Sequence, residues 1–384
     1  MQAKKIFNEK TRYIKVDKEN AQSFLNSIKK EMKSKKIIDK NKKILVENNF
    51  VLFPLIETNI NIENLTENLK VNFKFEIIIR KGYIPQNNTP TSLENILKEK
   101  LPEQVLKLIP RSYDIIGNIA IVEFDRFKNL DKMNSLIYKK EFANALIGVN
   151  KHIQSVYEKK SKIKGKFRLR KLRLIVGNDD SETIHKENHC LFKLDIKRTY
   201  FSPRLIQERD RISRLNIKDQ ELIIDMFAGV GPFSIQIAKN YNVMIYSFDV
   251  NKIAYDYLTE NIKLNKLKGK IFPFNINIKE LLRPKNKIGN KLEHKADRII
   301  MNLPEKSINY IDVACFLMKK SGGILHNYQL ASRDKPLEKS LIKLKLALKK
   351  NYWFIEHLIN SKIVKAYSPK LELVVLDLRI KTII

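Results

Sequence analysis

Near the middle of the chain, the nine residues DMFAGVGPF place a carboxylate and two glycines where an extended apolar run ends. Gly229 and Gly231 can let the backbone pass close to a bound molecule at points where a side chain would collide with it. Asp225 and Phe227 precede this turn, and Asp249 ends the next apolar run, where a carboxylate can accept hydrogen bonds from both hydroxyls of a ribose. The spacing predicts a nucleotide-like ligand bound by these five residues.

A second polar segment favours one cofactor over another. A glycine turn followed by an acid about twenty residues later also fits a nicotinamide dinucleotide, although Ser234 occupies the third glycine position of that pattern. The segment NLP ends a later apolar run and brings Asn302 and Pro304 toward the same crevice. A planar amide at that place suits an enzyme that methylates a base nitrogen, and a dehydrogenase does not need it. We therefore expect S-adenosylmethionine as the cofactor.

From residue 216 to the end, segments typical of strands alternate regularly with segments typical of helices. This pattern predicts the scaffold that positions these residues. We expect α/β architecture with a doubly wound, Rossmann-like parallel sheet of the class I methyltransferase type and an antiparallel final hairpin. The polar segment Pro284–Lys295 is expected to be a loop. The expected strands are 221–227, 243–249, 270–276, 297–304 and 322–330, with helices at 232–240, 251–265, 307–319 and 336–350 and closing strands in YWFIEHLI and LELVVLDLRI.

Charge and composition narrow the partner and exclude other classes. The chain has 384 residues, 74 Lys and Arg against 42 Asp and Glu, and a formal net charge of +32. So basic a chain favours nucleic acid as the partner, although a lysine-rich coding bias also raises the number. Two cysteines give no disulfide framework. No apolar run is long enough to cross a membrane, and the first residues lack a secretory signal.

One segment concentrates the positive charge. Lys159–Arg173 holds nine basic residues and no acidic one. Alternate residues are basic, so we expect a strand with a phosphate-contacting face and with Phe167 and Leu169 directed toward a core. The residues of the basic face are Lys162, Lys164, Lys166, Arg168 and Arg170.

The chain length predicts several domains. We expect a basic N-terminal extension at 1–50, a small α/β domain that binds RNA at 51–127, a small β-rich basic domain at 128–215 and the cofactor-binding domain at 216–384. YDIIGNIAIVEF is expected to form a strand pair that bends at Gly117, and His189–Ile196 a further strand. His185, His189 and Cys190 have a spacing seen in metal sites, but without a second ligand pair we assign them to packing and expect no metal.

Four segments of the chain resemble the tRNA (guanine-N1)-methyltransferases of archaea and eukaryotes, which modify guanosine 37 beside the anticodon. These are YFSPRLIQERDRI (Tyr200–Ile212), DMFAGVGPF (Asp225–Phe233), DRIIMNLP (Asp297–Pro304) and VKAYSPKLELVVLDLRI (Val364–Ile380). The resemblance runs from about Val51 to the C-terminus.

The resemblance implies a division of labour. Guanine N1 carries a proton that must leave before it attacks the methyl group, and the family's general base maps onto Glu208. Charge that builds on guanine O6 needs a fixed cation, a role that maps onto Arg168. Asn302 would hold the base and Arg204 would lie near the methionine part of the cofactor. The target base must leave its stack to enter such a pocket.

Further residues follow from the same comparison. Tyr200 and Pro304 would shape the base pocket, and Lys164 and Lys166 of the basic segment would contact the RNA. The family usually has an acid after the third strand, where it receives the adenine amine, but this chain has Asn277. An amide oxygen can still accept that hydrogen bond, yet a charge is lost, which predicts weaker cofactor binding.

Two other functions stay open. A related enzyme transfers the aminocarboxypropyl group of the same cofactor to a wyosine precursor in tRNA, and a tRNA-binding protein without catalysis is the second. The presence of Asn302, Glu208 and Arg168 favours methyl transfer. We expect a monomer that binds tRNA and no membrane, in the cytoplasm and also in the nucleus. A mitochondrial copy stays open, although Glu9 and Asp17 suit a transit peptide poorly.

Overall fold

The computed structural model describes residues 10–31, 37–39, 42–56, 74–81 and 92–383. The chain forms two compact units, residues 1–96 and 97–384, and each is described by itself. Among the described residues, every helix is too short or too polar to span a lipid bilayer.

The N-terminal unit is a four-stranded antiparallel sheet with the order β2-β3-β1-β4, and one helix packs on it. Phe24 of the helix lies 5.2 Å from Phe53 of the sheet, between ring centroids, and both side chains are fully buried. The prediction of an extension at 1–50 is wrong, because β1 pairs with both β3 and β4. The elements are β1 (Lys10–Asp17), η1 (Lys18–Asn20), α1 (Ala21–Glu31), β2 (Leu45–Glu47), β3 (Phe50–Pro54) and β4 (Phe75–Lys81).

The second unit begins with a small α/β domain whose sheet has the order β5-β6-β7-β8. The strand pair predicted in YDIIGNIAIVEF is confirmed, and Gly117 turns it with a φ of 55°. A Cβ there would lie 2.7 Å from the carbonyl oxygen of Ile184, so this turn needs glycine. Helix α3 (Leu93–Lys100) spans the division between the two units. The elements after it are α4 (Glu103–Leu106), β5 (Tyr113–Ile116), β6 (Ile119–Val122), η2 (Asp125–Phe127), α5 (Lys132–Val149), β7 (Ser155–Lys159) and β8 (Leu172–Gly177).

Two predictions about this region are wrong. The proposed boundary at residue 127 cuts through the domain, because β6 pairs in parallel with β7 across helix α5. The expected basic strand is a turn between β7 and β8, closed by a bridge between Lys164 and Leu169. Gly165 and Arg168 take φ values of 75° and 56°, which a regular strand excludes. A periodicity of two in charge therefore did not mark a strand.

A short hairpin follows the small domain, formed by β9 (Glu182–Glu187) and β10 (Cys190–Asp195), which confirms the strand expected at 189–196. Its turn residues Asn188 and His189 both have positive φ, as a two-residue hairpin turn requires. Asn261 of helix α8 (Lys252–Leu264) and Asn265, which directly follows that helix, accept hydrogen bonds from the β10 backbone. The hairpin therefore packs on the C-terminal domain, whereas we had expected it in a separate β-rich domain.

The C-terminal sheet has the order β13-β12-β11-β14-β15-β17-β16, with β17 antiparallel to both of its neighbours. The doubly wound sheet and its final hairpin are confirmed. Pro284–Lys295, expected as a loop, contains the short helix α9. The elements are η3 (Pro203–Leu205), α6 (Ile206–Ser213), β11 (Leu222–Asp225), α7 (Pro232–Asn240), β12 (Met244–Asp249), α8 (Lys252–Leu264), β13 (Lys270–Asn275), η4 (Ile278–Leu282), α9 (Lys287–Leu292), β14 (Arg298–Met301), η5 (Ser307–Tyr310), α10 (Ile311–Leu317), β15 (Gly323–Ser332), α11 (Pro336–Lys349), β16 (Trp353–Ala366) and β17 (Leu371–Thr382).

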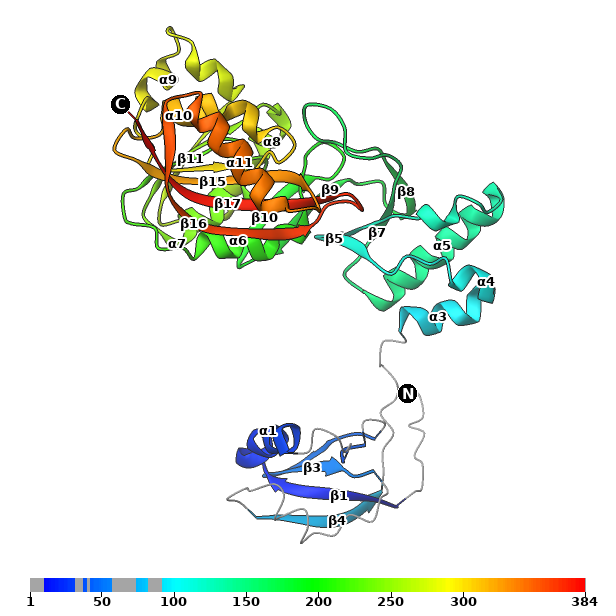
Figure 1. Cartoon of the computed structure of the whole chain (residues 1–384). Helices are drawn as coiled ribbons and strands as arrows, with labels where there is room; N and C mark the ends of the chain where they lie inside the picture. The colour runs from blue at the N-terminus through cyan, green and yellow to red at the C-terminus, as the bar shows by residue number, and fades with distance from the viewer. Residues whose placement is uncertain (1–9, 32–36, 40–41, 57–73, 82–91, 384) are drawn as a thin grey trace. The chain divides into compact units, whose positions relative to one another are not determined.

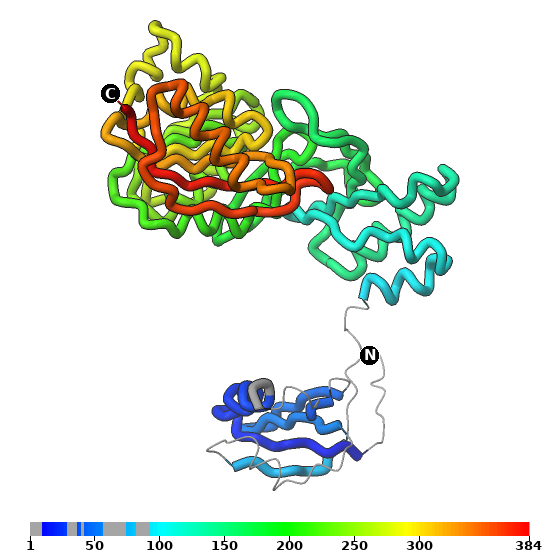
Figure 2. Tube along the Cα trace, viewed as in Figure 1, coloured from blue at the N-terminus to red at the C-terminus, as the bar shows by residue number. Residues whose placement is uncertain are grey.

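Helices cover both faces of this sheet, as the ribbon and the tube show (Figures 1 and 2). Helices α7 and α8 bury Ile235 and Leu258 in one apolar core, together with the β9–β10 hairpin. Helices α10 and α11 bury Val313 and Leu344 in a second core on the other face. Strands buried on both sides explain the continuous apolar runs of the sequence.

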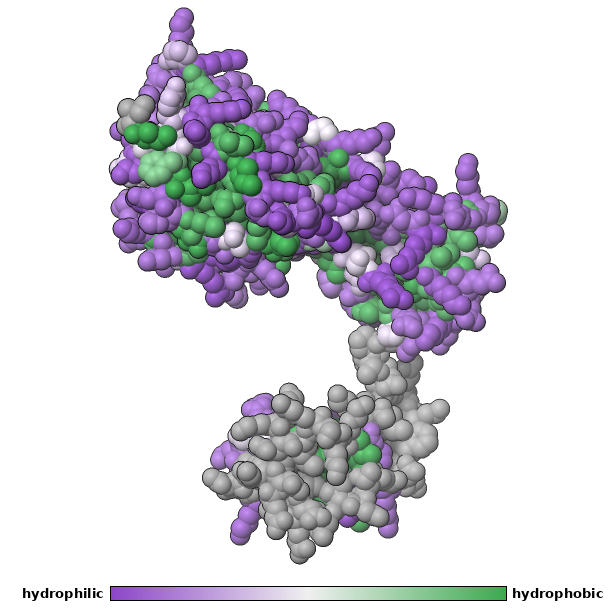
Figure 3. Space-filling model, viewed as in Figure 1, coloured by the Kyte–Doolittle hydropathy of each residue, from purple (hydrophilic) through white to green (hydrophobic). Residues whose placement is uncertain are grey.

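Strand β16 is one edge of the sheet and carries exposed apolar side chains. Phe354, Leu358 and Ile363 are 41–48% exposed, and Ile342 and Leu346 of α11 are exposed as well. Figure 3 shows apolar residues gathered on this face among hydrophilic surroundings. The strand is irregular, with three register shifts against β17.

Helix α6 is fixed by a buried ion pair. Arg209 is 2% exposed and donates to both oxygens of Glu187 on β9, at 2.5 and 2.6 Å. Gln236 of α7 also donates to Glu187 at 2.7 Å, and Arg209 donates to the backbone oxygen of Ser202. These contacts join α6 to the hairpin and to the first core helix.

Arg209→Met would leave the Glu187 carboxylate buried without its cation. We expect the free energy of unfolding of the second unit to fall by about 3–5 kcal/mol. Urea unfolding followed by the fluorescence of Trp353, the single tryptophan, measures it. Arg214→Met, which removes an exposed partner of Asp210, is the matched control and should cost less than about 1 kcal/mol. Equal losses in the two variants would contradict the role of the buried pair.

Candidate active site

A cavity lies at the carboxyl ends of β11, β12 and β14, where the strand order reverses. Gly229 lines it with a φ of 56°, and a Cβ built there meets nothing closer than the carbonyl oxygen of Tyr200, at 3.8 Å. Gly231 does not line the cavity. It begins α7 with a φ of 88°, and a Cβ there would lie 2.4 Å from Leu258. Gly229 thus opens the cavity to a ligand, and Gly231 lets two helices pack.

Two aspartates stand at this edge of the sheet. Asp249 lines the cavity, and its carboxylate accepts from the backbone N–H groups of Gly229 and Asn251, both at 2.8 Å. Burial raises the pKa of Asp249 and these two hydrogen bonds oppose the rise. Each oxygen keeps a lone pair for a ribose hydroxyl. Asp225, predicted to bind the cofactor, lies behind the cavity and accepts from Ser234, and burial raises its pKa to about 7.

The remaining wall of the cavity carries aromatic and amide side chains, which suit a ligand with a flat ring and a polar edge. Phe227 and Tyr310 pack edge to face with centroids 5.0 Å apart, and Asn277 and Asn302 line the cavity as predicted. The Asn277 side chain also accepts from the backbone N–H of Lys279. Tyr310 was missed because a tyrosine after an irregular loop has no sequence signal.

The turn between β7 and β8 closes the cavity from the other side. Lys166, Phe167 and Arg168 line it. The Arg168 guanidinium lies 4.2 Å from the ring centroid of Tyr200 and 3.7 Å from a carboxylate oxygen of Glu305. Its Nε is buried without a hydrogen-bond partner. An unpaired donor in such a place is costly unless a ligand accepts from it.

A large cleft of about 1340 Å³ lies between the small α/β domain and the sheet, within the second unit. Eleven lysines and arginines and four acids line it. Arg168 and Tyr200 line both this cleft and the cofactor cavity. The two spaces therefore meet at these two residues.

Arg204 lies in the cleft and not in the cofactor cavity, contrary to its predicted place beside the methionine part of the cofactor. Its Nε donates to Asp114 of β5 at 2.6 Å, so it joins the two domains. Lys365 lies nearby and donates to Ser202 at 3.2 Å. Burial and the adjacent Arg204 lower the pKa of Lys365 to about 8, with Asp114 acting in the opposite direction.

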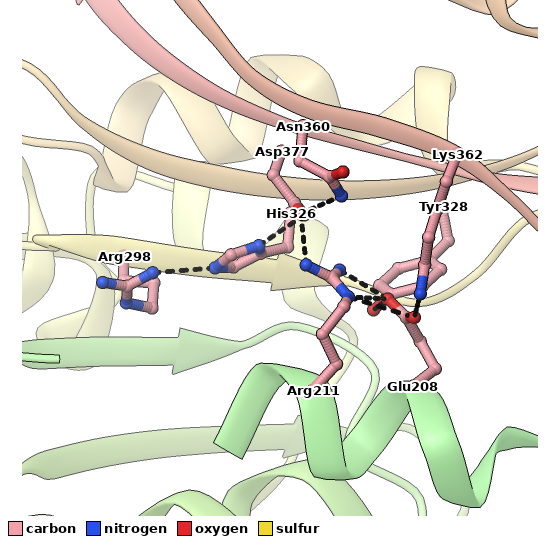
Figure 4. Close-up of polar contacts among 8 residues, drawn as sticks. All are labelled: Glu208, Arg211, Arg298, His326, Tyr328, Asn360, Lys362 and Asp377. Atoms are coloured by element: carbon pink, nitrogen blue, oxygen red, sulfur yellow. Dashed lines mark hydrogen bonds and ion pairs between the residues drawn. The ribbon is translucent and has the colours of Figure 1, made fainter. Parts of the chain in front are cut away.

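Glu208, the predicted general base, lines neither space and is 2% exposed. It lies on α6 and binds Arg211, Tyr328 and Lys362 (Figure 4). The residues just before it, Ser202–Arg204, form part of the cleft wall. Glu208 is therefore close in sequence to the cleft wall without lining the cleft, whereas Arg168 lines both spaces.

Of the other predicted residues, some line one of the two spaces and others lie outside both. Pro304 is buried, lines neither space and accepts at its backbone oxygen from Leu330, so it supports the loop of Asn302. Lys164 is exposed and outside both linings, and Lys166 belongs to the cofactor cavity. His185 accepts from the backbone N–H of Gly117 and packs on Phe201.

The sheet order and this cavity define a class I methyltransferase that uses S-adenosylmethionine. The cavity fits that molecule on its own evidence, because Gly229 leaves open space and Asp249 retains acceptor capacity. Asn277 offers an amide to an adenine edge, and Phe227 and Tyr310 offer aromatic surface.

Comparison with known proteins places the chain within one family. The TRM5/TYW2 methyltransferase domain family matches residues 183–355, and the TYW2 N-terminal domain matches residues 93–180. The tRNA (guanine(37)-N(1))-methyltransferase Trm5b of Pyrococcus abyssi is 33% identical over 344 residues, which covers 89% of this chain and 92% of that protein. The chain belongs to the TRM5/TYW2 methyltransferase family.

Solved structures agree over nearly the whole chain. Trm5b of Pyrococcus abyssi superposes with a TM-score of 0.67 at 32% identity, over 97% of this chain and 99% of that one. The complex of aTrm5 and tRNALeu gives 0.63 at 30% identity, over 96% and 99%. A tRNA(Phe) (4-demethylwyosine(37)-C(7)) aminocarboxypropyltransferase of Methanocaldococcus jannaschii is 33% identical over 58% of this chain and 84% of its own length.

Asn277→Asp should strengthen cofactor binding, because a charged acceptor makes a stronger hydrogen bond to an adenine amine than an amide oxygen does. A gain of about 1 kcal/mol corresponds to an affinity about fivefold higher. The aspartate can still accept from the Lys279 N–H. Isothermal titration with S-adenosylmethionine measures it. Asn286→Asp at the start of α9, which caps its helix in the same way, is the control. Unchanged affinity in Asn277→Asp would contradict the assigned contact.

Proposed function

We propose that this chain transfers the methyl group of S-adenosylmethionine to N1 of the guanosine at position 37 of tRNA, beside the anticodon. The observation that carries the proposal is the meeting of two spaces at Arg168 and Tyr200. On one side lies a cavity suited to the cofactor, and on the other a cleft whose lining has seven more basic than acidic residues. The family and its tRNA-bound member support the choice of substrate.

The charged cleft suits RNA because lysines and arginines neutralise phosphates. A base that leaves its stack can reach the place where the cleft and the cavity meet, at which Tyr200 offers an aromatic ring. The side chain of Asn302 lines the cavity on the same side and can hold a ring nitrogen or amine. Residues of one chain line both spaces, which supports a monomer as the working unit. The substrate supports the cytoplasm, or the nucleus, as its place of action.

The bound cofactor supplies an electrophilic methyl group on a sulfonium centre. Guanine N1 must lose its proton to attack, and we assign Glu208 as the group that accepts it. Since Glu208 lines neither space, its side chain must turn toward the cleft when the base enters. The buried Nε of Arg168 lacks a partner and can donate to guanine O6 as negative charge develops there.

The proposal is tested with two tRNA transcripts that differ only at position 37. The guanosine-37 transcript should take up labelled methyl from S-adenosylmethionine, and the adenosine-37 transcript should stay at background. Mass analysis of the digested product separates a methyl from an aminocarboxypropyl group. Equal labelling of the two transcripts, the heavier adduct, or binding without any transfer would contradict the proposal.

Glu208→Gln keeps the size of the side chain and removes the base. We expect the single-turnover rate of methyl transfer to fall by about 10²–10⁴-fold, with tRNA affinity changed by no more than a few-fold. Asp210→Asn, which changes an acid of the same helix paired with exposed Arg214, should leave the rate intact. A wild-type rate in Glu208→Gln would exclude Glu208 as the base.

A further inference from the structure

Figure 4 shows a continuous polar network that runs from Glu208 across four strands of the sheet, β14, β15, β16 and β17. Glu208 accepts from Arg211 at 2.5 Å and from the Tyr328 hydroxyl at 2.9 Å, and its other oxygen lies 2.7 Å from the Lys362 ammonium. Arg211 also donates to Asp377 at 2.7 Å. Two carboxylates therefore share one arginine.

The charges at the far end of the network determine what Arg211 can neutralise. Burial would raise the pKa of Asp377, but hydrogen bonds from His326 and Arg211 outweigh burial and lower it, so Asp377 is ionised. Burial lowers the pKa of His326, with Asp377 opposing. The neutral ring donates from Nδ1 to Asp377 and accepts at Nε2 from Arg298. Because the histidine adds no charge, Asp377 and Glu208 share the single charge of Arg211, which donates three hydrogen bonds to Glu208 and one to Asp377.

Among the described residues that contact the Glu208 carboxylate, Lys362 is the second cation beside Arg211, and it is not shared with Asp377. Tyr328 is fully buried, and burial together with Glu208 raises its pKa well above the ordinary value, so its hydroxyl stays protonated. With Lys362 present, the two anions, Glu208 and Asp377, face two cations. Without Lys362, a buried site would keep one negative charge in excess.

A strand irregularity places Lys362 there. Lys362 lies opposite Val375 and Lys365 lies opposite Leu373, with an extra residue, Val364, between them. In a regular strand, residues three apart point to opposite faces. Leu373, Val375 and Asp377 of β17 are two residues apart, so their side chains share one face of the sheet. Because the bulge leaves Lys362 opposite Val375 and Lys365 opposite Leu373, both lysines lie on the face of Asp377. Lys362 therefore reaches Glu208, and Lys365 reaches the cleft wall.

Lys362 also differs from the other partners in its access to water. Its side chain is 39% exposed, whereas that of Arg211 is 22% exposed and Tyr328 is fully buried. A lysine on an edge strand can move with the carboxylate when it turns toward the substrate. Because Lys362 contacts both Glu208 and water, a proton on Glu208 can pass to solvent on the side of Lys362.

We propose that Lys362 is a positioning residue for methyl transfer, which holds Glu208 ionised in the resting enzyme and restores that state after each turnover. The inference rests on the function proposed above. In that reaction the N1–H bond breaks and its proton joins Glu208. The N1 electron pair forms the bond to the methyl group, and the pair of the broken sulfur–methyl bond returns to sulfur. The proton then leaves Glu208 for water beside Lys362.

The test is the pH profile of the single-turnover rate of the full chain on guanosine-37 tRNA. Lys362→Met should move the acid limb of the profile to higher pH by about one unit, because an opposite charge next to a carboxylate favours its ionised form. The rate on the high-pH plateau should change by no more than a few-fold. Lys362→Arg should return the limb to its wild-type position. Lys381→Met removes an exposed charge from β17, away from Glu208, and serves as the matched control.

Each outcome decides the matter. A limb that stays in place in Lys362→Met, or that moves equally in Lys381→Met, overturns the role of Lys362 while leaving the proposed function intact. A lower plateau with an unmoved limb, accompanied by a lower unfolding midpoint in urea, assigns Lys362 a structural role and overturns the proposal. A wild-type rate in Glu208→Gln removes the base itself, and with it both the mechanism and the inference, and this result comes from a different variant.

Discussion

Helix α6 can stay buried only because each of its inward charges has a counter-charge from another part of the fold. Arg209 is paired with Glu187 of the hairpin, and Glu208 with Lys362 of the sheet edge. Arg211 is paired with Asp377 as well. The desolvated Arg209–Glu187 pair tolerates little displacement, since loss of either partner leaves the other unpaired. The helix is therefore a fixed reference that aligns the hairpin, the sheet and the segment Ser202–Arg204 at the cleft.

The reactive centre is assembled around this reference from segments distant in sequence. The turn between β7 and β8 brings Arg168 over Tyr200, and Asn302 and Asp249 come from the ends of two strands. Arg204 ties the small domain to the same place through Asp114. Cations from both domains line one cleft, so RNA that enters it contacts both domains.

The sequence was sufficient for the periodic parts of the structure. Strand and helix order in the C-terminal domain, the turn at Gly117 and the ligand-lining positions Gly229 and Asp249 all followed from apolar runs and turn residues. The N-terminal sheet was missed because it is built from strands far apart in sequence. The basic turn was mistaken for a strand because a segment in which every second residue is basic can form a turn as well as a strand. The contact of Lys362 with Glu208 depends on the bulge at Val364, and a bulge has no signature in sequence.

The open edge of β16 has a consequence for the behaviour of the protein in solution. In the described part of the chain the outer backbone of β16 pairs with no other strand, and this edge and its apolar side chains would let two copies meet. A formal net charge of +32 opposes that contact at long range. This repulsion extends over about 10 Å at 0.1 M salt and about 3 Å at 1 M. Colloidal stability should thus decline as ionic strength rises, the reverse of the pattern for proteins that precipitate through attraction between unlike charges.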